Sequence, residues 1–465
     1  MPDIPADAPN PPPAPPDDGT TRHGVPRPST WSLLRPLVLR LHFYAGLFVA
    51  PFILVAAVTG LLYVWTPQLE QAVYAHELRV PVGAEPLPLH QQIAAARAAA
   101  PDAVAHAVRP GGSPEETTRV LFDTGELAES TRLAVFVDPY TGEVRGTLDS
   151  YGSSGALPVR GWIDLLHREL HLGDAGRLYS ELAASWLWLV AAGGVAMWVT
   201  RRRRRRVRGL LVPEPRARGS RRTLSFHGTI GLWAFVGLLL VSATGLTWSQ
   251  YAGENVTSIR SALSWQTPAV SAEIPADSPG PVGVDVGVDR ALAAARAAGL
   301  EGPVEVILPA GGDTGYTISE LDRSWPTRFD SVAVDPSTGQ ITDTVRFADF
   351  PLMAKLARWG IDAHMGLLFG VPNQLVLTAL ALGLATVIAL GYRMWWRRRP
   401  AARPGIAPVW RALPWHLRGA VVVVFAGLGL LMPLLGASLL LFVAGDLLLT
   451  RRGGGQAAST GVPRA

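Results

Sequence analysis

Hydrophobic residues gather in long blocks along the chain, and two long stretches of mixed polarity separate them. Four of the blocks come close to the roughly 20 residues that an α-helix needs to cross the hydrocarbon core of a bilayer. The pattern therefore predicts four membrane-spanning helices, over residues 31–66, 177–200, 225–248 and 371–396.

A fifth apolar block, residues 419–449, has Pro433 and Gly436 near its middle and arginines at both ends. A helical hairpin that turns at Pro433 would keep both ends on one side of the membrane. One long kinked span would instead place the two ends on opposite sides. The sequence leaves both arrangements open, and we favour the hairpin.

Arginine clusters lie at one end of every predicted span. If the spans alternate in direction, all the clusters fall on the same side, and the positive-inside rule makes that side cytoplasmic. The N-terminus is then cytoplasmic, and the segments 67–176 and 249–370 lie outside. The remaining cytoplasmic parts are the proline-rich tail 1–30, expected to be disordered, the basic loop 201–224, the linker 397–418 and the tail 450–465.

The two outer segments share a pattern. Each contains an alanine-rich helical stretch, Leu89 to Ala100 in the first and Val288 to Ala298 in the second. Each then contains a tight-turn motif between two strand-like runs, Asp138-Pro-Tyr-Thr-Gly142 and Asp335-Pro-Ser-Thr-Gly339. We therefore predict an internal duplication: an α-helical membrane bundle that carries two α+β outer domains.

Histidines repeat with the same spacing at the inner ends of the first and third spans. His42 is followed by Gly46 and then by Thr59-Gly60. His227 is followed by Gly231 and then by Thr244-Gly245. Two histidines at one membrane depth predict a site shared by two helices.

A second set of histidines precedes spans two and four, on the outer side. His171 and His364 each lie eleven residues before a leucine of the next span, and His167 lies one helical turn before His171. The sequence thus predicts an inner pair, His42 with His227, and an outer pair, His167 or His171 with His364. Paired neutral imidazoles are suitable axial ligands of electron-transfer haems, so we expect two haem b groups.

Glycines accompany the predicted pairs. Gly46 and Gly231 lie one turn from their histidines, and Gly60 and Gly245 lie eighteen residues on, which is five full turns. All four should share the histidine face of their helices, and a flat macrocycle could approach the backbone there.

Composition narrows the alternatives. The chain has no cysteine, which excludes disulfides, iron–sulfur clusters and covalently attached c-type haem. The net charge of +5 comes from arginines at span ends, so the expected partner is the lipid bilayer and not nucleic acid. No glycine-rich dinucleotide fingerprint follows a predicted strand. A separate electron donor, a quinol or a cytoplasmic reductase, is therefore expected.

The chain resembles the PepSY-associated transmembrane helix family, also called iron-regulated membrane proteins. Four motifs carry the resemblance: Leu41-His42 with Gly46, Leu165-Leu-His-Arg-Glu-Leu170, His364-Met-Gly-Leu-Leu-Phe-Gly370 and Gly391-Tyr-Arg-Met-Trp-Trp-Arg-Arg-Arg-Pro400. The resemblance implies a bacterial inner-membrane protein with PepSY-like outer domains. It also implies a possible di-haem reductase of ferric siderophores, with His167 at the histidine of the family motif.

Two other function classes stay open. PepSY-like domains in other proteins resemble binding or protease-inhibiting modules, so the chain could be a membrane-anchored regulatory protein without haem. A metal or siderophore transporter is a weaker alternative, because carboxylates are scarce within the spans.

Overall fold

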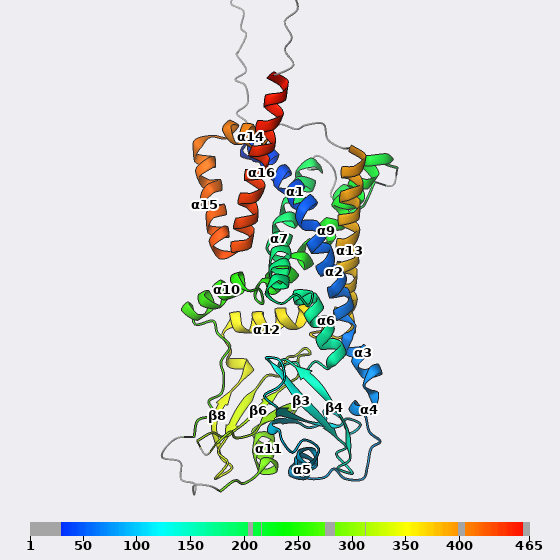
Figure 1. The fold of residues 1–465 in the computed structure, drawn as a ribbon, viewed down its shortest axis with the longest axis vertical. Coiled ribbons are helices and arrows are strands. Elements are labelled where there is room, and N and C mark those ends of the chain that lie inside the picture. The colour runs from blue at the N-terminus through cyan, green and yellow to red at the C-terminus, as the bar shows by residue number, and fades with distance from the viewer. Residues whose placement is uncertain are drawn as a thin grey trace, which may run out of the picture.

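The computed structural model describes residues 29–202, 208–214, 216–274, 284–311, 313–398 and 405–458 (Figure 1). A bundle of long apolar helices stands on a region built around one β-sheet. Most of the proline-rich N-terminal tail, parts of the basic loop and of the linker, and the last residues of the C-terminal tail lie outside the described residues.

Five helical stretches in the described residues are long and apolar enough to cross a membrane. The first is a continuous run of α1 (Thr30–Tyr44), η1 (Ala45–Val49) and α2 (Ala50–Val64). In the bundle α9 packs against both α7 and α13, and α2 also packs against α7 and α13. These stretches correspond to the four predicted spans and to part of the fifth apolar block. The later four are α7 (Asp174–Arg202), α9 (Gly219–Leu246), α13 (Val371–Arg398) and α16 (Pro433–Ala458).

The π-helical turn η1 follows from Pro51. Proline has no backbone N–H, so the carbonyl of Leu47 loses its usual partner one turn away. The hydroxyl of Tyr392 on α13 donates to that carbonyl at 2.8 Å. The irregular turn therefore also joins the first and fourth spans.

The fifth apolar block forms two helices, α15 (Trp415–Leu431) and α16, which pack against each other after a break at Met432. Gly429 and Gly436 face each other across the pair, and a Cβ at Gly429 would lie 3.3 Å from Gly436 Cα. Of the two arrangements that the sequence allowed, the structure has the hairpin. Figure 1 shows it beside the main bundle, with α14 (Ile406–Ala412) at its open end.

The outer segments build a single antiparallel sheet of eight strands in the order β4-β3-β2-β1-β5-β6-β7-β8. The predicted turns are confirmed: Gly142 (φ +74°) and Gly339 (φ +72°) bond back to Asp138 and Asp335 and connect β3 to β4 and β7 to β8. The strands are β1 (Val104–Arg109), β2 (Thr118–Asp123), β3 (Thr131–Val137), β4 (Val144–Tyr151), β5 (Val304–Ile307), β6 (Tyr316–Glu320), β7 (Ser331–Val334) and β8 (Ile341–Val345).

Continuity of the sheet differs from the expectation of two separate α+β domains. β1 of the first segment pairs with β5 of the second, with Ala107 opposite Ile307 and Val108 opposite Val306. Each segment alone would leave this strand as an exposed edge with unpaired backbone groups. Pairing the two edges satisfies those groups and makes one sheet from both segments.

One sheet face is covered by α5 (Leu89–Ala99) and α11 (Val288–Ala297), whose apolar residues join those of the strands in one core. The other face looks toward the bundle (Figure 1). Two amphipathic helices occupy the space between: α6 (Pro158–Glu169) packs on α2 and α7, and α12 (Leu352–His364) packs on α9. Short helices complete the described part: α3 (Thr66–Val73), α4 (Ala75–Leu78), α8 (Arg208–Leu211), α10 (Tyr251–Ala262) and η2 (Phe347–Asp349).

Candidate functional site

The inner histidines face each other across two spans. His42 lies near the C-terminal end of α1, and His227 lies in the N-terminal third of α9. Their ring centres are 6.3 Å apart, and the angle between the ring planes is 89°. The predicted inner pair is thus brought together by packing of helices that are far apart in the sequence.

The outer pair consists of His167 and His364. His167 sits in the last turn of α6 and His364 is the last residue of α12, and their ring centres are 6.4 Å apart. His171 is not part of this pair. The chain reverses after α6 through left-handed Leu170 and His171, and the His171 ring packs on Trp162 at 4.8 Å. In the structure His167, and not His171, lies opposite His364.

The hydrogen bonds of the four rings fix their tautomers. His42 Nδ1 lies 3.0 Å from the carbonyl of Val190, and His227 Nδ1 lies 2.9 Å from that of Val387. A carbonyl only accepts, so each Nδ1 carries the proton and donates it. Each Nε2 is then left with its lone pair free, which is the form that binds a metal.

In the outer pair, a threonine hydroxyl lies within hydrogen-bond distance of Nδ1 of each histidine. Thr59 Oγ1 donates to Val55 O at 2.9 Å and lies 2.9 Å from His167 Nδ1. Thr244 Oγ1 donates to Leu240 O at 2.7 Å and lies 2.6 Å from His364 Nδ1. With each hydroxyl hydrogen donated to its carbonyl, as these distances allow, the oxygen can accept from the histidine Nδ1 and leave Nε2 with its lone pair.

Burial keeps the outer rings uncharged. It lowers the pKa of His167 to about 4, and burial together with the neighbouring His167 ring lowers the pKa of His364 to about 3. Both imidazoles are therefore neutral at neutral pH.

The glycines divide into two groups. At Gly46 and Gly231 a Cβ would meet no atom within 4 Å, which agrees with the predicted open helix face. Gly60 and Gly245 do not leave a gap. A Cβ at Gly60 would lie only 3.2 Å from His167 Cε1, so this glycine gives the His167 ring room, whereas a Cβ at Gly245 would make an ordinary contact with His364 Cε1 at 3.8 Å.

Sequence reasoning missed two glycines of the inner pair. A Cβ at Gly194 of α7 would lie 3.0 Å from His42 Cε1, and one at Gly391 of α13 would lie 3.6 Å from His227 Cε1. It also missed the hydroxyl role of Thr59 and Thr244. The repeated Thr-Gly dipeptide was the available signal, because it recurs at the same distance from both inner histidines.

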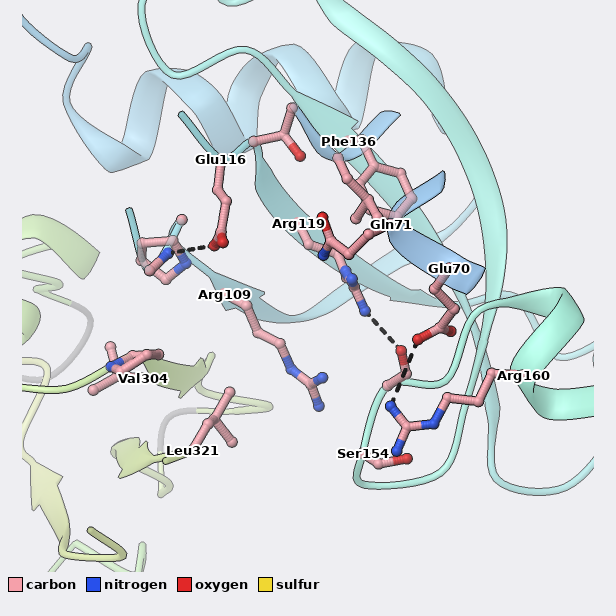
Figure 2. A pocket seen from close by; sticks show the side chains of 17 residues that line it. Glu70, Gln71, Arg109, Glu116, Arg119, Phe136, Ser154, Arg160, Val304 and Leu321 are labelled. Atoms are coloured by element: carbon pink, nitrogen blue, oxygen red, sulfur yellow. Dashed lines mark hydrogen bonds and ion pairs between the residues drawn. The ribbon is translucent and has the colours of Figure 1, made fainter. Parts of the chain in front are cut away.

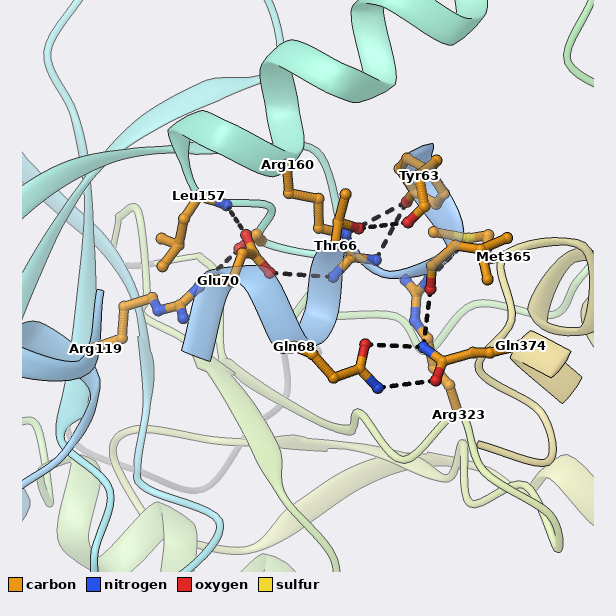
Figure 3. Close-up of polar contacts among 12 residues, drawn as sticks. Tyr63, Thr66, Gln68, Glu70, Arg119, Leu157, Arg160, Arg323, Met365 and Gln374 are labelled. Atoms are coloured by element: carbon orange, nitrogen blue, oxygen red, sulfur yellow. Dashed lines mark hydrogen bonds and ion pairs between the residues drawn. The ribbon is translucent and has the colours of Figure 1, made fainter. Parts of the chain in front are cut away.

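A group of polar side chains connected by hydrogen bonds and ion pairs begins one helical turn from Thr59 (Figure 3). Tyr63, one helical turn beyond Thr59, accepts from Arg160 at 3.2 Å, and Arg160 also forms an ion pair with Glu70 at 3.6 Å. On the other side Asp362 is fully buried and pairs with Arg358 at 2.9 Å. Burial raises the pKa of Asp362, and the arginines beside it oppose that shift.

Among the described residues no group of three or more histidine, aspartate or glutamate side chains could hold a metal ion. Each histidine pair therefore brings two imidazoles together without a third such side chain beside them in the described part of the chain. Of the remaining described histidines, His90 lies on Asp289 and His106 on Asp123, both in the outer region.

A family model described as the PepSY-associated TM region matches residues 39–398. The chain belongs to this family. All four paired histidines lie within the matched region, whereas the α15–α16 hairpin follows it. No curated protein matches the chain. Membership in the PepSY-associated TM family supports a membrane protein, in agreement with the five apolar helical stretches.

Proposed function

We propose that this protein binds two haem b groups, one at each histidine pair, and transfers electrons across the membrane to ferric chelates on its outer face. The separation of the rings is the observation that carries the proposal. With metal–nitrogen bonds of about 2 Å and about 1 Å from each nitrogen to its ring centre, imidazoles on one iron have ring centres about 6 Å apart. The observed separations are 6.3 Å and 6.4 Å.

The number of ligands favours haem over a bare metal ion. A bare zinc site takes at least three protein ligands, and each pair offers two. Haem brings four nitrogens of its own and needs only two axial ligands. His42 and His227 would hold the inner haem, and His167 and His364 the outer one, with Gly46 and Gly231 leaving room beside the inner pair.

The depth of the two pairs suits a path across the bilayer. Seventeen residues of helix separate His42 from Thr59, which contacts His167, and this is about 25 Å along the helix axis. Bound haem would supply one-electron chemistry at both depths. The protein orients the four imidazoles, keeps them neutral and excludes water from them.

The orientation of the protein in the membrane is inferred from the positions of its arginines. The start of α1, the end of α7, the start of α9 and the end of α13 all lie at the end of the bundle away from the sheet (Figure 1). These helix ends carry Arg35, Arg201, Arg221 and Arg397, and the positive-inside rule makes that end cytoplasmic. We therefore propose that the sheet lies outside, and the family resemblance implies that the membrane is a bacterial inner membrane. The electron donor would be a quinol or a separate cytoplasmic reductase.

The proposed acceptor is a ferric siderophore or a similar ferric chelate at the outer face. Reduction would release the iron, because Fe(II) binds hard oxygen chelators less tightly than Fe(III). If both histidines of a pair held one haem iron, they would occupy its protein-facing positions, so the acceptor would dock beside the outer pair.

Absorbance spectra of the detergent-purified protein, oxidised and dithionite-reduced, test the proposal. We expect reduced b-type bands and about two haems per chain. His42→Ala and His364→Ala should each remove one haem, and His171→Ala, the matched control, should keep both. A colourless protein from cells with ample haem would refute the proposal and favour a PepSY regulatory protein without haem.

A further inference from the structure

A polar cavity of about 250 Å³ lies between the first and second outer segments, on the bundle side of the sheet. Its walls come from α3, strands β1 and β2, the loop before α6 and the start of β5 (Figure 2). Exposed Gly111 and Gly112 form part of its rim. Three guanidinium groups, from Arg109, Arg119 and Arg160, point into this space.

Two of these arginines have carboxylate partners. Arg109 binds Glu305 at 2.6 Å, across the β1–β5 junction, and Arg160 binds Glu70 at 3.6 Å. Arg119 donates to the backbone carbonyl of Gly155 at 2.8 Å and stacks on Phe136. Within the described residues no carboxylate lies at ion-pair distance from Arg119. Burial and the nearby Arg109 charge lower the pKa of Arg119 to about 10, so it still carries its charge at neutral pH.

The loop that ends at Ala156 holds two of these groups in place. Arg109 donates to Ser153 O at 3.2 Å, next to the bond from Arg119 to Gly155 O. Gly155 has φ +63°, and a methyl group there would overlap Arg109 Nη1. The glycine thus allows the two guanidinium groups to converge, although their like charges repel.

We propose that this cavity binds a small carboxylate-bearing anion, with Arg119 and Arg109 as its main hydrogen-bond donors. Arginine presents a planar fork of N–H donors that matches a carboxylate in two parallel bonds. Glu116 also lines the cavity, and the backbone N–H of Gly112 donates to its carboxylate at 3.0 Å.

The size of the cavity favours an organic anion. A water molecule occupies about 30 Å³ in the liquid, so a cavity of 250 Å³ is much larger than a single sulfate or phosphate requires. A molecule with two or three carboxylates could reach Arg109 and Arg119 together.

A series of side-chain contacts leads from the cavity toward the outer histidine pair. Arg160 forms its inner wall and also donates to Tyr63, one turn from the threonine that holds His167 (Figure 3). A ferric chelate with free carboxylates would therefore dock close to the outer site. This last step rests on the proposed function, whereas the anion site itself does not.

Calorimetric titration of the detergent-purified full chain with iron-free citrate tests the site. We expect saturable binding that weakens at least about tenfold in Arg119→Gln, which loses a charge-assisted hydrogen bond. Arg119→Lys keeps the charge and should retain part of the affinity. Arg132→Gln, on the exposed Arg132–Asp123 pair of the same sheet, is the matched control and should change affinity less than about twofold.

Absence of citrate binding, equal binding in Arg119→Gln, or equally tight binding of sulfate would each overturn the assignment. If Arg119→Gln does not fold, the comparison of Arg119→Lys with Arg132→Gln decides in its place. Citrate binding requires neither iron nor haem, so a colourless protein that binds citrate through Arg119 would refute the electron-transfer function and leave the anion site intact.

Docking of a ferric chelate in the cavity is tested in a separate experiment. Dithionite-reduced protein is mixed with anionic ferric citrate or with a cationic ferric trihydroxamate, and reoxidation is followed by absorbance. Arg119→Gln should slow reoxidation by ferric citrate and leave the rate with the cationic chelate unchanged. Equal slowing with both chelates would contradict docking of the substrate in this cavity.

Discussion

Thr244 Oγ1 accepts a hydrogen bond from His364 Nδ1 at 2.6 Å, and Thr59 makes the same contact with His167 at 2.9 Å. Two threonines from different spans thus orient the two outer rings in the same way. A hydrogen bond from Nδ1–H makes the opposite nitrogen a stronger ligand and fixes the ring.

Replacing these threonines should change the outer haem selectively. Thr59→Val keeps the side-chain shape and removes the acceptor, so we expect outer haem affinity to fall about tenfold. The midpoint potential of the outer haem should rise, because a less basic imidazole stabilises the ferric form less. Thr386→Val, which loses only an intrahelical bond to Leu382 O, is the control in a spectroscopic redox titration. An unchanged potential in Thr59→Val would contradict the role of the threonine.

Gly194 should be essential for the inner site. A methyl group there would lie 3.0 Å from His42 Cε1 and would force the ring to move. Gly194→Ala should therefore lower the content of inner haem, measured as haem per chain. Its neighbour provides a matched control: a Cβ at Gly193 would make an ordinary contact at 3.5 Å with Val38. Equal haem content in both variants would argue against the ring position described above.

Asp446 of α16 links the C-terminal hairpin to the first span through hydrogen bonds to α1. Its buried carboxylate accepts from Arg40 at 3.1 Å, from Tyr44 and from the backbone N–H of Ile406. Asp446→Asn leaves Arg40 without its buried partner, which costs about 3 kcal/mol when such a pair is broken. We expect a lower unfolding temperature in a fluorescence melt, with haem content preserved. Exposed Glu129→Gln should melt like the native protein.

Asp289 should make the outer region sensitive to acid. Although partial burial alone would raise its pKa, hydrogen bonds from the His90 ring and from the backbone N–H groups of Leu89 and His90 hold the pKa of Asp289 below its usual value. A depressed folded-state pKa gives stability above the unfolded value near 4, and that stability is lost as pH falls further.

This aspartate of α11 caps the first turn of α5, so Asp289→Ala should cost about 1 kcal/mol at neutral pH. Melts at pH 7 and below pH 4 should show a smaller acid effect in the variant than in the native protein. The same acid effect in both proteins would show that other groups dominate.

The amino-acid sequence alone predicted the membrane spans, the inner histidine pair and two tight turns. The apolar blocks predicted the spans, because a bilayer accepts only helices whose backbone groups are paired internally. The matched spacing after His42 and His227 predicted that these residues would meet at one depth. The turns at Gly142 and Gly339 followed from local backbone chemistry, which needs no distant contact.

Other features required the folded chain. His167 and His171 are one turn apart in sequence, and only the left-handed reversal at Leu170 turns His171 toward Trp162. The single sheet depends on pairing of β1 with β5, some 200 residues apart, and the side-chain pattern of an edge strand does not identify its distant partner. Gly194, Gly391 and the arginine cavity come from elements that meet only in three dimensions, so no local signal could assign them.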